Sequence, residues 1–177
     1  MLHFPHALVV IPVAMCSAVS AGDIVSTYDV GTGAMTAEIQ FDFFNGNTHL
    51  YSLHWDGALS GRDVFDVLLS AQPAYFNFEY ETYSFGDFLT GLSIGGDTDS
   101  GAGTPPDYID YWHYWTSDGG GAYEESMIGF NNRMLSDGAA DAWVFGHNGA
   151  PATIPAPPAF ILLLATMHRR NNRAKSS

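Results

Sequence analysis

A strict alternation of apolar and polar side chains from Met35 to Phe44 constrains the fold of this chain more than any other feature. In MTAEIQFDFF, Met35, Ala37, Ile39, Phe41 and Phe43 fall on one face, and Thr36, Glu38, Gln40 and Asp42 fall on the other. This period of two is typical of a strand with one buried face. The turn residues NGN at 45–47 and the strand pattern HLYSLHW at 49–55 follow, so we expect a β-hairpin.

The period changes once, in SGRDVFDVLLSA at 60–71. Ser60 and Asp63 have the spacing of a capping box, in which each side chain accepts a hydrogen bond from the backbone N–H of the other residue. An apolar stripe of helical period follows, formed by Val64, Phe65, Val67, Leu68 and Leu69. Pro73 ends the pattern. We therefore expect a single helix after the hairpin.

Strand patterns return after this helix. AYFNFEYETY at 74–83 alternates, FGDFLTGLSIGG at 85–96 is a shorter apolar stretch, and GGDTDSGAGTPP at 95–106 is expected to be a loop. The aromatic stretch that follows ends in an Asp118–Gly119 turn, and a last strand is expected around 143–145. This order predicts an α+β fold, β-grasp-like, with one main helix packed on a mixed β-sheet.

The N-terminal end has the composition of an export signal. The apolar run ALVVIPVAM at 7–15 has the length of a signal-peptide core and is too short to span a bilayer as a helix. Small residues at 19–21 predict cleavage between Ala21 and Gly22. Cleavage there removes Cys16, the single cysteine, so we expect a mature protein without thiol or disulfide chemistry.

The C-terminal end combines a Pro-rich segment, the apolar run AFILLLATM at 159–167 and a basic tail. An apolar run of this length reaches about 14 Å as a helix, roughly half of a hydrocarbon core. The order resembles the PEP-CTERM sorting signal of exported bacterial proteins, with PAP in place of Pro-Glu-Pro, and implies an exosortase-like enzyme as a partner. A disordered tail is the alternative. The expected organisation is a signal peptide at 1–21, a β-grasp-like domain at 22–150, a Pro-rich linker at 151–158 and a sorting tail at 159–177.

Charge is distributed unevenly along the chain. All 19 acidic residues lie between Asp23 and Asp141, where only Arg62 and Arg133 are basic. Such a surface repels phosphate backbones and anionic membranes, so nucleic acid is not an expected partner. Cationic ligands remain open, and a simply acidic, soluble secreted surface is the alternative.

The densest aromatic stretch, at 108–115, is the candidate binding site. As a strand it would place Tyr108, Asp110, Trp112 and Tyr114 on one face, and Ile109, Tyr111, His113 and Trp115 on the other. Exposed Trp and Tyr side chains offer a large apolar area with a hydrogen-bonding tip, as recognition surfaces often do. The alternative is that Trp112 and Tyr114 belong to the core. The candidate ligand-binding residues are Tyr111, Trp112, His113, Tyr114, Trp115 and Trp143.

The sequence predicts no catalytic residues. The histidines of the body form no His-Glu-x-x-His motif, and GALSG at 57–61 has the wrong spacing for a nucleophile elbow. Carboxylate pairs for glycoside hydrolysis arise by folding and carry little weight in so acidic a chain. Asp97 and Asp99 are candidate calcium ligands, but their stretch lacks the closing glutamate of an EF-hand, so a solvated loop is the alternative. We therefore expect a protein that is not an enzyme.

Four blocks in order resemble the transcobalamin C-terminal-like family, a β-grasp module related to the SLBB domains. DVFDVL at 63–68 is similar to the start of the family's helix, and GDFLTGLSIGG at 86–96 to the block after it. WHYWTSDG at 112–119 is similar to its aromatic strand, and LSDGAADAWVF at 135–145 to its ending. The resemblance covers roughly residues 35–146. It implies a noncatalytic module that contacts a corrinoid or another organic ligand.

Together these features predict an exported, surface-sorted binding module, at the cell surface or outside the cell, with a transient C-terminal membrane anchor as a further option. Its expected partners are a small organic ligand or an envelope component, together with signal peptidase and the sorting machinery. The alternative is a structural protein of the cell envelope or extracellular matrix that takes no small ligand.

Overall fold

The computed structural model describes residues 23–146 and 149–151. The expected cleavage point at Ala21 and Gly22 and the expected sorting tail at 159–177 lie outside the described residues. Within the described part of the chain, no helix is both long enough and apolar enough to cross a membrane.

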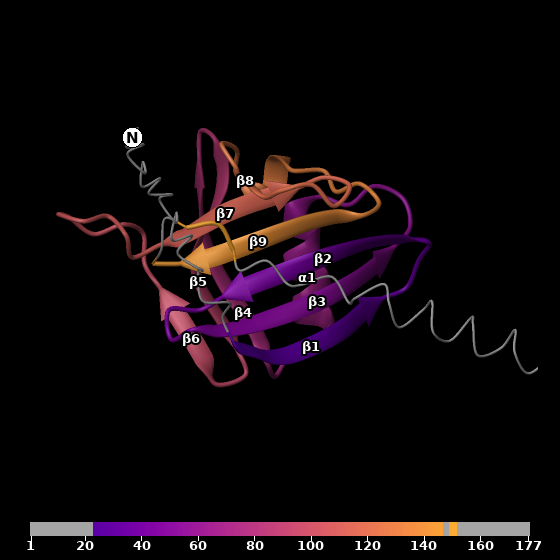
Figure 1. The fold of residues 1–177 in the computed structure, drawn as a ribbon, viewed down its shortest axis with the longest axis horizontal. Helices are drawn as coiled ribbons and strands as arrows, with labels where there is room; N and C mark the ends of the chain where they lie inside the picture. Colours follow the sequence, from indigo (N-terminus) through magenta and orange to yellow (C-terminus); the bar gives the residue numbers. More distant parts are fainter. Residues whose placement is uncertain (1–22, 147–148, 152–177) are drawn as a thin grey trace, which may run out of the picture.

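Six strands form the main sheet, in the order β1-β3-β2-β9-β7-β8 (Figure 1). Their bounds are β1 Asp23–Gly31, β2 Met35–Asp42, β3 Asn47–Trp55, β7 Trp112–Ser117, β8 Glu124–Glu125 and β9 Ala139–Phe145. β1 runs parallel to β3, and β2 runs parallel to β9. The other neighbours, β2–β3, β7–β9 and β7–β8, are antiparallel, so the sheet is mixed as the sequence predicted.

The predicted hairpin and helix are both confirmed. β2 and β3 pair from Met35↔Trp55 to Asp42↔Thr48. The helix α1 spans Gly61–Ala71, and both hydrogen bonds of the capping box are present. The backbone N–H of Asp63 donates to Ser60 Oγ at 3.1 Å, and the backbone N–H of Ser60 donates to Asp63 Oδ2 at 2.9 Å. The box satisfies N–H groups that an α-helix leaves free at its first turn.

A second sheet, of three strands, corrects the prediction of one mixed sheet. Its order is β4-β5-β6, with β4 at Phe76–Tyr83, β5 at Gly86–Ile94 and β6 at Asp97–Ser100. The stretch 95–106 was expected to be a loop, but its residues 97–100 pair with residues 91–94 of β5. β6 contains no apolar residue, so only its backbone pairing marks it as a strand.

The edge strand β1 is absent from the sequence prediction. Most of its side chains are exposed, and apolar and polar residues do not alternate along DIVSTYDVG. The strand is held by its parallel pairing with β3 and by the stacking of Tyr28 on Tyr51, with ring centroids 4.8 Å apart. Its position therefore depends on a partner strand rather than on its own pattern.

The core lies between the main sheet and a layer made by α1 and the second sheet (Figure 1). Phe41 of β2, Phe65 of α1 and Phe76 of β4 are fully buried. Their ring centroids lie 5.7 to 5.9 Å apart, within the range of favourable aromatic pairs. These contacts join all three units into one α+β core.

Candidate functional site

The aromatic stretch forms a shorter strand than the sequence predicted. β7 begins at Trp112, and Tyr108 has a φ of 50°, which breaks the extended backbone before it. Trp112 and Tyr114 point to the core side of the sheet. Trp112 is fully buried, with its ring edge-on to Phe43 at 5.1 Å. The alternative that placed Trp112 and Tyr114 in the core is therefore correct for this face.

The candidate residue Trp143 of β9 pairs with Tyr114 across the sheet. Their rings stack at 4.4 Å with an angle of 13° between their planes. Phe41 stacks against Trp143 at 5.4 Å, and Phe65 meets it edge-on at 4.9 Å. These contacts fix the orientation of the Trp143 indole.

A buried ion pair fixes the other end of Tyr114. Its hydroxyl donates to Asp141 Oδ2, and Arg133 Nε lies 3.3 Å from Asp141 Oδ1. Burial raises the pKa of Asp141, although the bond from Tyr114 and the charge of Arg133 oppose the rise. Burial also raises the pKa of the Tyr114 hydroxyl. Arg133 reaches onward to Asp118 at 2.7 Å, so one guanidinium serves two carboxylates.

The opposite side of β7 differs from the prediction of an exposed ligand face. His113 is buried, with its ring centroid 3.9 Å from that of Tyr111 and its Nδ1 3.5 Å from Glu125 Oε1. Its burial follows from these two neighbours, which come from the segments before and after the strand. Trp115 is half-buried, and its indole N–H has no hydrogen-bond partner in the described part of the protein.

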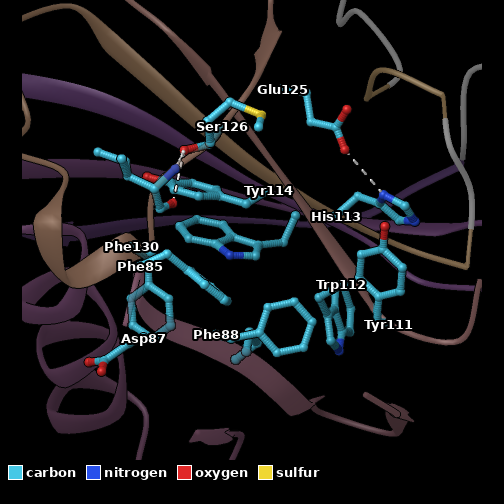
Figure 2. A pocket seen from close by; sticks show the side chains of 15 residues that line it. Phe85, Asp87, Phe88, Tyr111, Trp112, His113, Tyr114, Glu125, Ser126 and Phe130 are labelled. Carbon is cyan, nitrogen blue, oxygen red and sulfur yellow. Dashed lines mark hydrogen bonds and ion pairs between the residues drawn. The ribbon is translucent and has the colours of Figure 1, made fainter. Parts of the chain in front are cut away.

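A cavity of about 270 Å³ lies beside β7, between the main sheet and β5 (Figure 2). β8 pairs only with residues 115 and 116 of β7, so the strand before this point faces β5 and the segment 125–130. Five of the six candidate ligand-binding residues line the cavity, and Trp115 does not. The lining is Phe85, Asp87, Phe88, Leu89, Tyr111, Trp112, His113, Tyr114, Glu125, Ser126, Met127, Ile128, Gly129, Phe130 and Trp143.

The polar side chains of the cavity are few. Asp87 is buried, accepts a hydrogen bond from Thr82 Oγ1 at 2.7 Å and lies 3.8 Å from Arg62. Glu125 is about half exposed and faces His113. Ser126 Oγ donates to the backbone oxygen of Ile128 at 3.1 Å. Burial and the negative charge of Glu125 raise the pKa of Tyr111.

A row of aromatic rings continues from the cavity onto the surface. Phe88 lies 5.7 Å from Tyr111, Phe85 lies 6.4 Å from Phe88, and Tyr83 stacks on Phe85 at 5.3 Å. Tyr83 and Phe85 are 44 % and 47 % exposed. Met127, which lines the same cavity as Phe85, is 87 % exposed. We call Tyr83, Phe85, Phe88 and Tyr111 the aromatic row. It gives the cavity an apolar mouth.

Neither a family model nor a curated protein matches this chain.

The candidate calcium ligands have structural hydrogen bonds. Asp97 accepts from Asn45 at 2.7 Å and from Asn47 at 3.0 Å, and His49 Nε2 lies 2.8 Å from its Oδ2. Asp99 accepts from the backbone N–H of Phe44 at 2.8 Å. Within residues 23–146 and 149–151, no three His, Cys, Asp or Glu side chains gather so as to hold a metal ion.

Sequence reasoning did not find the side of the cavity formed by residues 85–89 and 125–130. Residues 85–89 lie far from β7 in the chain, residues 125–130 come soon after it, and neither segment shows a local motif. The one signal was composition, because Phe85 and Phe88 are bulky aromatic residues beside the glycines of a short strand. Their approach to β7 follows from the docking of the second sheet, which local patterns do not encode.

Proposed function

We propose that this chain is an exported, surface-sorted, noncatalytic module that binds a small organic ligand in the cavity beside β7. The observation that carries the proposal is the cavity itself, lined mainly by aromatic and aliphatic side chains with a few polar groups at its wall. Sites for small organic ligands commonly have this composition. Export and sorting rest on the sequence of the two ends.

The size of the cavity limits what enters it. Its volume of about 270 Å³ lies just below the roughly 300–1,000 Å³ of pockets that enclose drug-sized ligands. One ring or one branched head group fits such a space. A corrinoid, the ligand implied by the family resemblance, would contact the aromatic row with its periphery and stay mostly outside.

The order of the central strands supports the proposal of a β-grasp fold. β2 and β9 are parallel neighbours, β3 and β7 flank them, and α1 follows the β2–β3 hairpin. In a β-grasp fold the first and last strands of the core lie parallel and side by side, with the helix across them. On this proposal, β1 and the sheet β4-β5-β6 are additions to that core.

The hydrogen bonds at the cavity support a noncatalytic role. A nucleophile needs a base within hydrogen-bonding reach. Ser126 Oγ instead makes two hydrogen bonds to the backbone of Ile128. It accepts one from the N–H at 3.4 Å and donates the other to the carbonyl oxygen at 3.1 Å. Asp87 accepts a hydrogen bond from Thr82 and lies within ion-pair distance of Arg62.

Thermal unfolding of the purified protein against a ligand panel tests the proposal. The panel contains cobalamin, cobinamide, haem, calcium with a chelator control, and small aromatic and ammonium compounds. A ligand at one hundred times its dissociation constant stabilises the native state by about 2.7 kcal/mol. We expect at least one organic compound to raise the melting temperature in a dose-dependent way.

Two tyrosine variants locate the effect. Tyr111→Ala removes a ring that lines the cavity, whereas Tyr75→Ala removes an exposed ring that is not part of its lining. The stabilisation should be lost in the first variant and kept in the second. A shift that survives Tyr111→Ala, or no shift with any compound, would count against the binding proposal.

The exposed apolar residues at the cavity mouth favour one second candidate function. Phe85, Met127 and Ile128 are all exposed there, and exposed apolar patches commonly mark contacts between proteins. A structural protein of the envelope or matrix would use this patch for assembly and take no small ligand. Its signature is self-association that Met127→Asp abolishes, with no response to the ligand panel.

A further inference from the structure

We propose that the ligand of this cavity is an organic cation whose substituted ammonium head enters between the aromatic rings. This inference rests on the proposed binding function and names the class of ligand. Three features of the site carry it: the ring faces of its wall, the carboxylate of Glu125 beside them, and the engagement of both arginines by other carboxylates.

The ring faces come first. Tyr111 and Phe88 stand at an angle of 39° to each other on one side of the cavity, and Phe85 stands at 89° to Phe88 (Figure 2). Rings at several angles present more than one π face to the same space. The negative face of an aromatic ring attracts a cation within about 6 Å of its centroid, and cages of such rings bind quaternary ammonium groups.

Two carboxylates lie beside these faces. Glu125 is about half exposed at the cavity, and the pKa of the Tyr111 hydroxyl is raised by burial and, to a smaller extent, by the negative charge of Glu125. Asp87 is part of the cavity lining and is buried. A bound cation would therefore gain attraction from Glu125 in addition to the ring faces.

Within the residues that the structure describes, an anionic ligand would find no arginine or lysine that is not already paired with a carboxylate. Arg62 and Arg133 are the only Lys or Arg residues in the described part of the chain. Arg62 lies over the Tyr80 ring at 3.9 Å and within 4 Å of Asp66 and Asp87. Arg133 is held by Asp118 and Asp141. The same region carries all 19 acidic residues, so its field attracts cations and repels anions.

Binding of choline and of its uncharged isostere, 3,3-dimethyl-1-butanol, measured by calorimetry at low ionic strength, tests the inference. The two probes have the same shape, so a difference between them reports the charge. We expect choline to bind at least about tenfold more tightly, because a cation–π contact and a nearby carboxylate each add attraction. Added salt should weaken the binding of choline and leave that of the alcohol unchanged.

Paired glutamate variants provide the control. Glu125→Gln removes the carboxylate at the cavity and should weaken choline binding about threefold or more. Glu124→Gln changes the neighbouring residue of β8, which is exposed and is not part of the lining, and should leave the affinity unchanged. Equal losses in both variants would mean that the acidic surface, and not this cavity, holds the cation.

The outcomes separate the two proposals. Equal affinity for the two probes, or binding of other panel compounds but not of choline, overturns the cationic ligand and leaves the binding function standing. Failure of every probe to bind overturns both. Choline binding that Tyr111→Ala and Glu125→Gln each weaken supports both.

Discussion

The rings of Tyr111 and Phe88 lie with their centroids 5.7 Å apart and join the approach to β7 to strand β5 of the second sheet. The cavity is lined by both residues and therefore exists only where the two sheets meet. Its shape depends on how α1 and the second sheet pack on the main sheet. The shape of the cavity therefore depends on stability, and each variant used to test the proposed binding needs a measurement of its stability.

Removal of the helix cap should have a small and specific cost. Ser60→Ala deletes the side chain that accepts a hydrogen bond from the N–H of Asp63. Loss of such a cap costs about 1 kcal/mol of the free energy of unfolding, which urea denaturation measures. Ser70→Ala, an exposed serine in the last turn of the same helix, should change it little. Equal effects of the two substitutions would contradict the role of the capping box.

Truncation of Trp143 should cost much more. Its indole contacts Tyr114, Phe41 and Phe65, and the side chain is fully buried. Trp143→Ala leaves a large cavity and should lower the free energy of unfolding by about 3–5 kcal/mol. Trp115→Ala is the matched change on the other side of the sheet, at a half-buried position. A loss at Trp115 as large as that at Trp143 would contradict the placement of the core.

Arg133→Gln should destabilise the protein in a manner that depends on pH. The substitution leaves the buried carboxylate of Asp141 without its positive partner, and breaking such a pair costs about 3–5 kcal/mol. Burial already holds the pKa of Asp141 above its usual range, and loss of Arg133 raises it further. A group whose pKa is raised by folding is favoured in its protonated form, so acid relieves the cost.

Urea denaturation of this variant between pH 7 and pH 4 checks the sign. The deficit relative to the wild type should be largest at pH 7 and should shrink as the pH falls. Arg62→Gln, which loses a half-exposed pair with Asp66 and a longer approach of 3.8 Å to the buried Asp87, should cost less than Arg133→Gln. A loss of unfolding free energy in Arg133→Gln that grows toward low pH would contradict the assignment of Asp141 as the carboxylate left without a positive partner.

The carboxylate that ties β6 to the main sheet should make folding sensitive to acid. Burial of Asp97 tends to raise its pKa, but hydrogen bonds from His49, Asn45 and Asn47 outweigh this effect and lower it. Its stabilising contribution is therefore present above the unfolded pKa, about 3.9, and is lost as the pH falls through the lower folded value. Asp97→Asn should flatten the decline in melting temperature below about pH 4. Asp107→Asn, an exposed loop carboxylate, should follow the wild type.

Local patterns predicted the elements that carry their own signal. The period of two at residues 35–55 gave the β2–β3 hairpin, and the capping spacing of Ser60 and Asp63 located the start of α1. The apolar faces of these elements meet the core, so the pattern of apolar residues in their sequences predicts which side chains are buried. The same alternation grouped Trp112 and Tyr114 on one face of β7, but it did not decide which face meets the core.

Elements held by their partners escaped prediction. β1 is an exposed edge strand, and β6 has no apolar residue, so each depends on backbone pairing with a neighbour. The cavity has a similar cause. Glu125 reaches the cavity through the pairing of β8 with β7, and Phe88 through the docking of the second sheet, a tertiary event that no spacing along the chain records. Trp115, a predicted ligand residue, lies outside the cavity although it shares a face of β7 with His113, and it stands where β8 pairs with β7.

Amide chemical-shift mapping of the protein during titration with choline, indole and benzyl alcohol is the most direct test of a binding site beside β7. We predict saturable shifts concentrated at residues 85–89, 111–114 and 125–130, which Tyr111→Ala removes and Tyr75→Ala leaves intact. Saturable shifts gathered elsewhere, or no saturable shift with any of the three, would contradict the account.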